Sequence, residues 1–395
     1  MKKSLVALAW AAALPAVAIQ PDSPWGEVLE KAQGQTVYFN AWGGSDRINQ
    51  YIDWVGEQVL ADYGVTLEHV KVGDIAEIVT QIESAKAVGK NQGGNVDLMW
   101  INGENFANLK QGDLLFGDFA NHLPNAAWVA DKPSITYDFS VPVEGLEAPW
   151  GGAQLVFLHD SEQLPNPPKS AQALLKHLQE GGRFAYPAPP AFHGTTFIKQ
   201  LLSELTQQPQ ALLQPVEQAD FEAVTAPLWS YLDQMHPLLR GQGKVWPASG
   251  EETRQLMDDG EIDLAISFNP NEASAAVREG QLADSVRTYI FEGGTVGNTH
   301  FVSIPFNAQA PAAAMVVANF LLSPQAQARK ADPAYWGDPT VLDLNKLQDV
   351  QKTRFEQIDL GIWALPIEQL ANTLSEPHAS WTAALEAAWA QRYAQ

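Results

Sequence analysis

The sequence has no cysteine among its 395 residues. That absence excludes disulfide bridges, thiolate nucleophiles and metal sites built on cysteine. The phosphate-binding pattern GxxxxGK[ST], the zinc-protease pattern HExxH and the serine-hydrolase pattern GxSxG are absent too, and no two of the eight histidines have metal-ligand spacing. We therefore expect neither a cofactor nor a bound metal, and the sequence offers no catalytic residue.

Basic residues are also scarce, because Lys and Arg total 24 against 46 Asp and Glu, which gives a formal charge of −22. A field of this sign repels nucleic acid and anionic membrane surfaces. We expect neither as a partner. The net charge says little about a small ligand, since a local site can differ in sign from the whole chain.

Long apolar runs are confined to the first 18 residues, MKKSLVALAWAAALPAVA. Two lysines precede an apolar stretch from Leu5 to Leu14, and Ala16-Val17-Ala18 has the small-x-small pattern of a cleavage site. The alternative is a buried N-terminal helix. We predict a signal peptide cleaved after Ala18. The protein is then exported and periplasmic, and it diffuses freely because no cysteine follows to carry a lipid.

Beyond residue 18 the sequence alternates between strand-like and helix-like segments. Thr36–Asn40, Val65–Val70 and Val96–Ile101 are rich in β-branched and apolar residues, as strands are. Apolar residues at helical spacing follow each of the first two. This alternation predicts a parallel sheet flanked by helices, whose strand-to-helix loops share one edge. Ligands bind at that edge in sheets of this kind.

A second series of the same type spans roughly residues 150 to 300. Strands are predicted at Gly182–Tyr186, Ile262–Phe268 and Val286–Phe291. From Pro311 onward the sequence is mostly helical.

The length of the chain exceeds what one hydrophobic core usually serves, so we predict two lobes. Lobe I comprises residues 19–149 together with residues 300–395, and it includes the helical C-terminal tail. Lobe II comprises residues 150–299.

Six segments follow one another along the chain: VYFNAWGGS, VDLMWINGENFANLKQGDLL, APWGGAQLVFLHDSEQLPNPPKSAQALL, GRFAYPAPP, SGEETRQLMDDGEIDLAISFNPNEASAAVREG and EGGTVGNTHFVSIPFNAQAPAAAMVVANFLLSPQAQ. In this order they resemble the type II periplasmic solute-binding proteins of ABC importers. More closely, the sequence is similar to the YnjB-type binding proteins. The resemblance covers most of the chain after residue 18.

This resemblance implies an α/β architecture, the two-lobed periplasmic binding protein (type II) fold. Each lobe would be a mainly parallel sheet flanked by helices, and hinge strands would join the lobes. It also implies closure on a small-molecule solute by hinge bending. The implied partners are a cognate ABC permease in the inner membrane and its ATPase, and the implied state is a monomer.

Candidate ligand contacts in lobe I lie in the loops after two predicted strands. A glycine turn at a helix start lets backbone N–H groups approach a ligand, and mixed donors and acceptors suit a polar solute. The alternatives are an ordinary tight turn and helix capping. The candidates are Trp42, Gly43, Gly44, Ser45, Asn102, Glu104 and Asn105.

Further candidates lie at the predicted crossing between the lobes and in lobe II. At the crossing, Trp150 and Gly151 serve either ligand contact or a simple bend. In lobe II, hydroxyl, amide and carboxylate groups stand at predicted helix starts, although acidic residues there also stabilise the helix dipole. These candidates are His193, Thr195, Thr196, Ser249, Glu251, Asn269, Asn271 and Glu272.

These features favour a binding protein that captures a small organic solute and delivers it to the permease. The alternative is an exported hydrolase, active on carbohydrate or ester, without a recognisable motif. The βαβ order and the absence of repeats disfavour a structural or adhesive protein.

The charge of the solute is a separate question. Trp42 or Trp150 with Glu104 and Glu272 would suit an organic cation, whereas the glycine turn and the two threonines would suit an oxyanion. We expect an organic solute with a cationic group.

Overall fold

The computed structural model describes residues 19–366, 369, 370 and 372–394. The predicted signal peptide and its cleavage site lie outside the described residues. Within the described part, no helix combines the length and the apolar character needed to cross a membrane.

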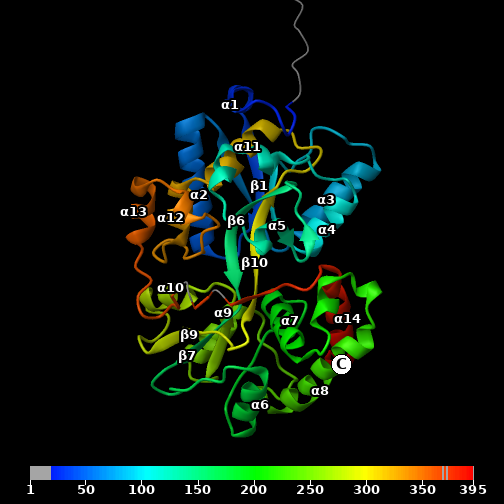
Figure 1. The fold of residues 1–395 in the computed structure, drawn as a ribbon, viewed down its shortest axis with the longest axis vertical. Coiled ribbons are helices and arrows are strands. Elements are labelled where there is room, and N and C mark those ends of the chain that lie inside the picture. The colour runs from blue at the N-terminus through cyan, green and yellow to red at the C-terminus, as the bar shows by residue number, and fades with distance from the viewer. Residues whose placement is uncertain (1–18, 367–368, 371, 395) are drawn as a thin grey trace, which may run out of the picture.

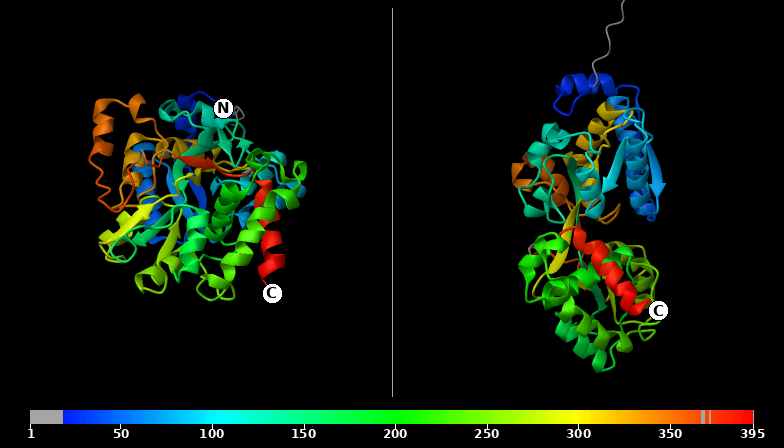
Figure 2. Two further views of the ribbon diagram at one scale, coloured as in Figure 1. Left: turned by 60° about the horizontal axis from the view of Figure 1, so that its bottom comes forward. Right: turned by 90° about the vertical axis from the view of Figure 1, so that its right-hand side faces the viewer.

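Two bodies, lobe I and lobe II, are stacked along the long axis and joined by strands that run from one to the other (Figure 1). Strands β6 (Glu147–Gln154) and β10 (Thr295–Ser303) pair antiparallel and form the central connection. A third connection passes through β11 (Thr373–Ser375), which pairs in parallel with the start of β10. The side view in Figure 2 shows the same two bodies meeting at a narrow waist. The predicted boundary between residues 149 and 150 falls inside β6.

The sheet of lobe I confirms the three strands predicted for it. β1 (Thr36–Trp42) pairs in parallel with β2 (Thr66–Val72) and with β3 (Leu98–Ile101). β1 continues to Trp42 because its pairing with β2 continues there. β10 adds to β3 in the antiparallel direction, so the sheet has the order β2-β1-β3-β10.

Helix α2 (Asp46–Tyr63) shows how sequence pattern and packing agree in this lobe. Its buried apolar residues Ile48, Tyr51, Ile52, Val55 and Val59 recur at three- and four-residue spacing and form one stripe against the core. Gly64 ends the helix with a left-handed φ of 66°, the usual C-terminal signal.

The remaining helices of this lobe are mostly short. They are α1 (Trp25–Ala32), α3 (Ala76–Ala87), α4 (Glu104–Gln111), α5 (Pro133–Thr136), α11 (Pro311–Leu321), α12 (Pro324–Ala331) and α13 (Asp349–Glu356), with 3-10 turns η1 (Phe119–His122), η2 (Pro124–Trp128) and η6 (Leu344–Lys346) and the small hairpin β4 (Tyr137–Asp138) and β5 (Val141–Pro142).

Lobe II corrects two expectations about its sheet. β7 (Val156–Asp160) lies between β8 (Leu264–Ser267) and β9 (Val286–Tyr289) and is antiparallel to both, so this sheet is not mainly parallel. The reason is that β7 continues from β6 and therefore runs away from lobe I, whereas β8 runs back towards it. The predicted strand at Gly182–Tyr186 is reduced to one bridge between Phe184 and Leu264.

Helices surround this smaller sheet. They are α6 (Ala171–Gln179), α7 (Phe192–Leu205), α8 (Phe221–Met235), α9 (Gly250–Asp258), α10 (Glu272–Arg278) and α14 (Ser380–Tyr393), with 3-10 turns η3 (Pro209–Leu213), η4 (Val216–Gln218) and η5 (His236–Leu238).

The C-terminal helix α14 belongs to lobe II, contrary to the assignment of all of residues 300–395 to lobe I. Trp381, Leu385 and Trp389 are almost fully buried and share a core with Phe197 of α7 and Trp229 of α8. These three residues recur every four positions and so form one apolar stripe. Figure 1 shows α14, in red, beside α7 and α8 in the lower body.

Candidate functional site

The turn between β1 and α2 lies at the inter-lobe boundary. Arg47, in the first turn of α2, donates to the Glu279 carboxylate and to the carbonyl oxygen of Ala275 (3.1 Å); Ala275 belongs to α10 of lobe II, and Glu279 directly follows that helix. The carboxyl ends of the parallel strands of lobe I therefore face lobe II, as predicted.

The glycines of this turn have a packing role. A Cβ atom added at Gly43 would lie 2.6 Å from Cβ of Lys71, and one added at Gly44 would lie 2.3 Å from the ring of Trp42. Only glycine fits at either position without a shift of its neighbour. Ser45 makes no side-chain capping bond, and both it and the half-buried Trp42 keep exposed surface at this turn.

A buried carboxylate holds the loop after β3 in place. Oδ2 of Asp138 accepts a hydrogen bond from the backbone N–H of Gly103 (2.6 Å), whose φ is +61°. Asn102, Glu104 and Asn105 are half-buried around it. Glu104 has no hydrogen bond or ion pair with any described residue, so its carboxylate is available to a solute.

In lobe II, the start of α7 brings three predicted residues together. The Thr195 hydroxyl donates to Oε1 of Glu386 on α14 (2.7 Å), which ties that hydroxyl to a carboxylate. Thr196 is only 1% exposed, and its side chain is unavailable in this arrangement. Burial lowers the pKa of His193, and the nearby Glu251 and Glu272 oppose that shift.

The predicted residues at the starts of α9 and α10 have different partners. The Ser249 hydroxyl accepts from the N–H of Glu252 (3.2 Å) and caps α9, which is the structural alternative considered for it. Glu251 is exposed, whereas Glu272 pairs with Arg254.

The polar loop after β8 reaches the other lobe. Oδ1 of Asn269 accepts from the N–H of Asn271 (3.0 Å), and Nδ2 of Asn271 donates to the carbonyl oxygen of Gly337 (2.7 Å). Gly337 precedes Asp338 in a segment that packs with lobe I. Asn271 is therefore engaged in an inter-lobe contact.

Trp150, on β6, presents no surface to a solute. It is 0% exposed and packs against Trp100 and Trp336, with ring centroids 4.9 and 5.3 Å away. Gly151 makes room for its neighbours, because an added Cβ would lie 2.0 Å from Nε2 of His300 and 2.1 Å from Oδ2 of Asp338.

Beside Gly151 lies a cluster that we call the Lys330 cluster, formed by Lys330, Asp338 and His300. Nζ of Lys330 donates to the Asp338 carboxylate and to the carbonyl oxygen of Pro339 (2.8 Å), and Nε2 of His300 lies 3.1 Å from Oδ2 of Asp338. All three side chains are buried. Burial lowers the pKa of Lys330, and Asp338 opposes that shift. This cluster was not predicted from the sequence.

Carboxylates from both lobes lie near one another at the boundary. Burial raises the pKa of Glu386 of lobe II, and the negative charges of Glu104 and Asp74 in lobe I raise it further. The Thr195 hydroxyl and the positive charge of Lys199 oppose that shift. Burial and the charge of Glu104 likewise raise the pKa of Asp138, against its bond from Gly103. These carboxylates are close enough to repel one another.

Three basic residues near this boundary are paired with carboxylates. Arg47 contacts Glu279, Arg254 contacts Glu272, and Nζ of Lys199 lies 3.1 Å from Oε2 of Glu376. Among the described residues, no group of three or more acidic or histidine side chains converges in a way that could hold a metal ion.

A cavity of about 290 Å³ lies beside the hinge strands, and we call it the hinge cavity. Lobe I, lobe II and both β10 and β11 contribute to its walls. The principal residues are Tyr137, Phe139, Leu213, Asn298, Ser375 and Glu376. None of the residues predicted from the sequence lines it, because it forms only where four distant segments meet.

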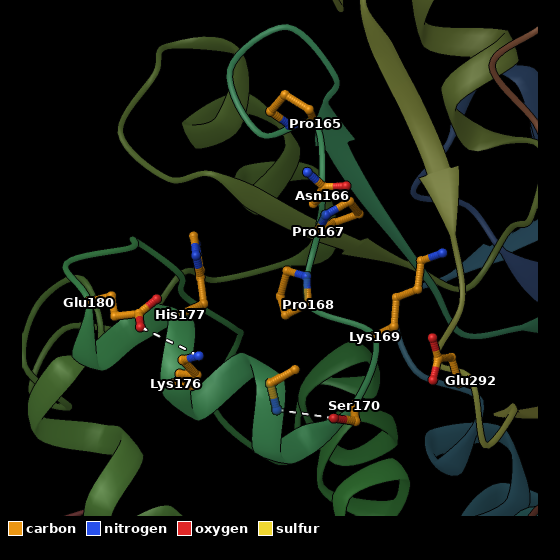
Figure 3. A pocket seen from close by; sticks show the side chains of 11 residues that line it. Pro165, Asn166, Pro167, Pro168, Lys169, Ser170, Lys176, His177, Glu180 and Glu292 are labelled. Carbon is orange, nitrogen blue, oxygen red and sulfur yellow. Dashed lines mark hydrogen bonds and ion pairs between the residues drawn. The ribbon is translucent and has the colours of Figure 1, made fainter.

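A larger cavity, about 540 Å³, lies on lobe II between the loop of residues 165–170 and α6 (Figure 3). Lys176 and Glu180, on its rim, lie 3.8 Å apart and are both well exposed. No candidate residue lines this cavity, and its charges are of both signs, so it carries no functional argument.

A sequence-family model described as bacterial extracellular solute-binding protein matches residues 54–353. The chain belongs to this solute-binding family. It is also 46% identical to Protein YnjB of Escherichia coli K12 over 372 residues, which cover 94% of each protein. Both findings confirm the resemblance seen in the sequence, and the members of this family are binding proteins.

Solved structures show the same two-lobed fold. The spermidine/putrescine ABC transporter substrate-binding protein PotD of Streptococcus pneumoniae has a TM-score of 0.63 at 14% identity, with 91% of this chain and 98% of that one covered. AfuA of Actinobacillus pleuropneumoniae, with fructose-6-phosphate bound, has a TM-score of 0.62 at 13% identity, with 91% and 99% covered. These likenesses confirm the type II periplasmic binding protein fold of this solute-binding protein.

Proposed function

We propose that this protein is the exported, periplasmic component of an ABC importer, that it holds a small organic cation between its lobes, and that it delivers the cation unaltered to a membrane permease with its ATPase. The observation that carries the proposal is that polar loops of lobe I face polar loops of lobe II, and that the two lobes are joined by strands about which they can bend. Membership of the solute-binding family and the likeness to substrate-binding proteins of ABC transporters support the importer assignment. A monomer suffices, since one chain supplies both lobes.

The choice of a cation rests on the charges at the boundary. PotD and AfuA are named with a polyamine and a sugar phosphate respectively, so the fold alone does not select the charge of the solute. Here Glu104 and Glu386 lie on opposite lobes and repel each other, since each raises the free energy of the other's charged form. Closure of the empty protein is therefore opposed, and a cation between the lobes removes that repulsion.

Aromatic surface is exposed at two of the candidate loops. Phe192, at the start of α7, is 45% exposed, and Trp42 of lobe I is half-buried at the turn between β1 and α2. A cation over such a ring gains about 0.5–2 kcal/mol. We therefore retain Trp42, Ser45, Asn102, Glu104, Asn105, His193, Thr195 and Glu251 as proposed contacts, and add Phe192 and Glu386 to them.

The first experiment is a thermal-shift screen of the protein without residues 1–18. Putrescine, spermidine, choline and thiamine represent cations, and phosphate, sulfate, glucose and amino acids serve as comparisons. A ligand at a 100-fold excess over its Kd stabilises the native state by about 2.7 kcal/mol. We expect a shift with one of the cations. A shift with oxyanions alone would contradict the cationic solute, and consumption of the ligand would favour the hydrolase alternative.

The residues are tested with matched variants. For the best cation, Glu104→Gln and Glu386→Gln should each weaken binding about ten-fold, which corresponds to about 1.4 kcal/mol. Glu83→Gln, at an exposed position of α3, is the control and should bind like the parent protein. Equal affinity in all four proteins would place the solute elsewhere.

A further inference from the structure

The hinge cavity has walls that belong to parts of the protein expected to move relative to one another. Tyr137 and Phe139 come from lobe I, and Leu213 comes from lobe II. Asn298 of β10 and Glu376, which directly follows β11, belong to two of the connections between the lobes. A molecule in this cavity would contact both lobes and the hinge at once.

One residue in the wall of the hinge cavity has an unpaired hydrogen-bond acceptor. Asn298 is 8% exposed, and its Nδ2 donates to Oε1 of Glu376 (3.1 Å). That bond sets the orientation of the amide. Oδ1 of Asn298 is buried and has no hydrogen-bond partner among the described residues. A buried acceptor of this kind favours an occupant that brings a donor, because leaving it unpaired costs free energy.

The rest of the cavity suits an uncharged body. Oε2 of Glu376 is neutralised by Nζ of Lys199 (3.1 Å), and the same Nζ lies 4.3 Å from the centre of the Phe139 ring. Tyr137 is 49% exposed and Leu213 is 38% exposed, so apolar surface remains open on the two lobes. At about 290 Å³, the space lies at the lower end of the range for small-molecule sites.

We propose that the hinge cavity is a second ligand site, distinct from the solute site, that takes a small uncharged molecule with an apolar body and one O–H or N–H donor aimed at Oδ1 of Asn298. Because its walls come from both lobes, the occupant stabilises the lobe arrangement in which these walls have this spacing. Occupancy and lobe closure are then coupled, and each changes the free energy of the other.

Phenol and anisole provide a matched pair of probes, since methylation removes only the donor. Ligand-observed NMR titration of the protein without residues 1–18 should show phenol binding about ten times more tightly than anisole. Leu213→Trp fills the space and should abolish phenol binding. Leu238→Trp, at a position of similar exposure (36%) outside the cavity, should leave it unchanged. Asn298→Leu should make the two probes equivalent.

Coupling to the lobes is measured by fluorescence energy transfer. The chain has no cysteine, so Val88→Cys and Val245→Cys, which are 80% and 60% exposed on lobes I and II, allow specific labelling. Phenol should change the transfer efficiency with the same saturation curve as its binding, and Leu213→Trp should remove that change.

Three results would overturn the second site: no binding of phenol, equal binding of phenol and anisole to the parent protein, or phenol binding that survives Leu213→Trp. A change in energy transfer that does not follow phenol binding would overturn the coupling. These outcomes are independent of the solute, because the test uses no cation.

Discussion

Two polar clusters in lobe I each contain buried carboxylates, but the two clusters differ in how that buried charge is balanced. The Lys330 cluster includes His300 of β10 and balances one carboxylate with a buried ammonium group. The second cluster, which we call the Asp138–Glu147 pair, includes Glu147 of β6 and has two buried carboxylates. Each cluster thus includes a residue of a hinge strand, but only the first has its own counter-ion.

The Asp138–Glu147 pair is poorly supplied with partners. Oδ1 of Asp138 and both carboxylate oxygens of Glu147 are buried without hydrogen-bond partners among the described residues. Lys110, whose positive charge acts on Glu147, lies 2.8 Å from Glu144 at the surface instead. Burial, followed by the negative charge of Asp138, raises the pKa of Glu147, and burial also raises that of Asp138. The difference teaches that a buried charge is balanced either by a counter-ion or by a retained proton.

The largest expected effect comes from removing the counter-ion of the first cluster. Lys330→Met leaves Asp338 charged, buried and without its main partner, and should lower the free energy of unfolding by about 3–5 kcal/mol. Urea denaturation at neutral pH measures this change. Lys176→Met, at an exposed lysine of α6, is the control and should have no measurable effect. A similar result for both variants would mean that the buried Lys330–Asp338 ion pair contributes nothing measurable to stability.

A steric change tests the same cluster without altering any ionisable group. Gly151→Ala forces a Cβ into the contact between His300 and Asp338 and should cost about 1–3 kcal/mol. Gly152→Ala is a neighbouring control, since its Cβ would meet Pro339 at an ordinary distance of 3.7 Å. Thermal unfolding of the two variants should separate them clearly, and equal melting temperatures would contradict the packing argument.

Removing a carboxylate from the Asp138–Glu147 pair should raise the free energy of unfolding, whereas the two substitutions above lower it. Since the pKa of Glu147 is raised in the folded state, the native protein binds more protons than the unfolded chain above the ordinary glutamate pKa of 4.5. Stability therefore falls as pH rises from about 4.5 towards the raised value. Glu147→Gln should remove this loss, gaining about 1–2 kcal/mol at pH 8 and little at pH 4.

Glu144→Gln is the control for this pH dependence of stability, because Glu144 lies three residues before Glu147 and is largely exposed. Denaturation series between pH 4 and pH 8 should show no comparable gain for it. A Glu147→Gln variant less stable than the parent at pH 8 would indicate that the carboxylate has a partner after all.

The smallest effect is expected at His300. Gln at this position can still donate a side-chain N–H to Asp338 while Lys330 remains in place, so His300→Gln should change the free energy of unfolding by less than about 1 kcal/mol. A loss as large as that of Lys330→Met, measured in the same denaturation series, would show that the histidine and not the lysine balances Asp338.

Much of the fold was accessible from the sequence. The strands of lobe I and their order along the chain follow from apolar composition and from helical spacing between them, and the structure confirms them. Strand direction in lobe II was predicted wrongly, because it depends on how β7 enters from β6 and not on local residues. The stripe of α14 predicts a helix, but it does not identify the lobe against which that helix packs.

Less of the candidate site could be predicted from the sequence. Loops after parallel strands are brought to the inter-lobe boundary as predicted, because topology decides their position. Side-chain direction is a different matter: Trp150 points into the core, and Gly151 and Ser249 serve packing and capping. Glu386 and the hinge cavity could not be foreseen, since they depend on contacts between segments far apart in the sequence.

The position of α14 also governs when lobe II can be completed during synthesis. Its core begins with Leu155 and Phe157 but includes Trp381 and Trp389, so more than half of the chain separates its first members from its last. A polypeptide made from its N-terminus holds this apolar surface open until its final segment is available. Products truncated before Trp381 would expose that surface permanently and become preferred substrates for proteolysis.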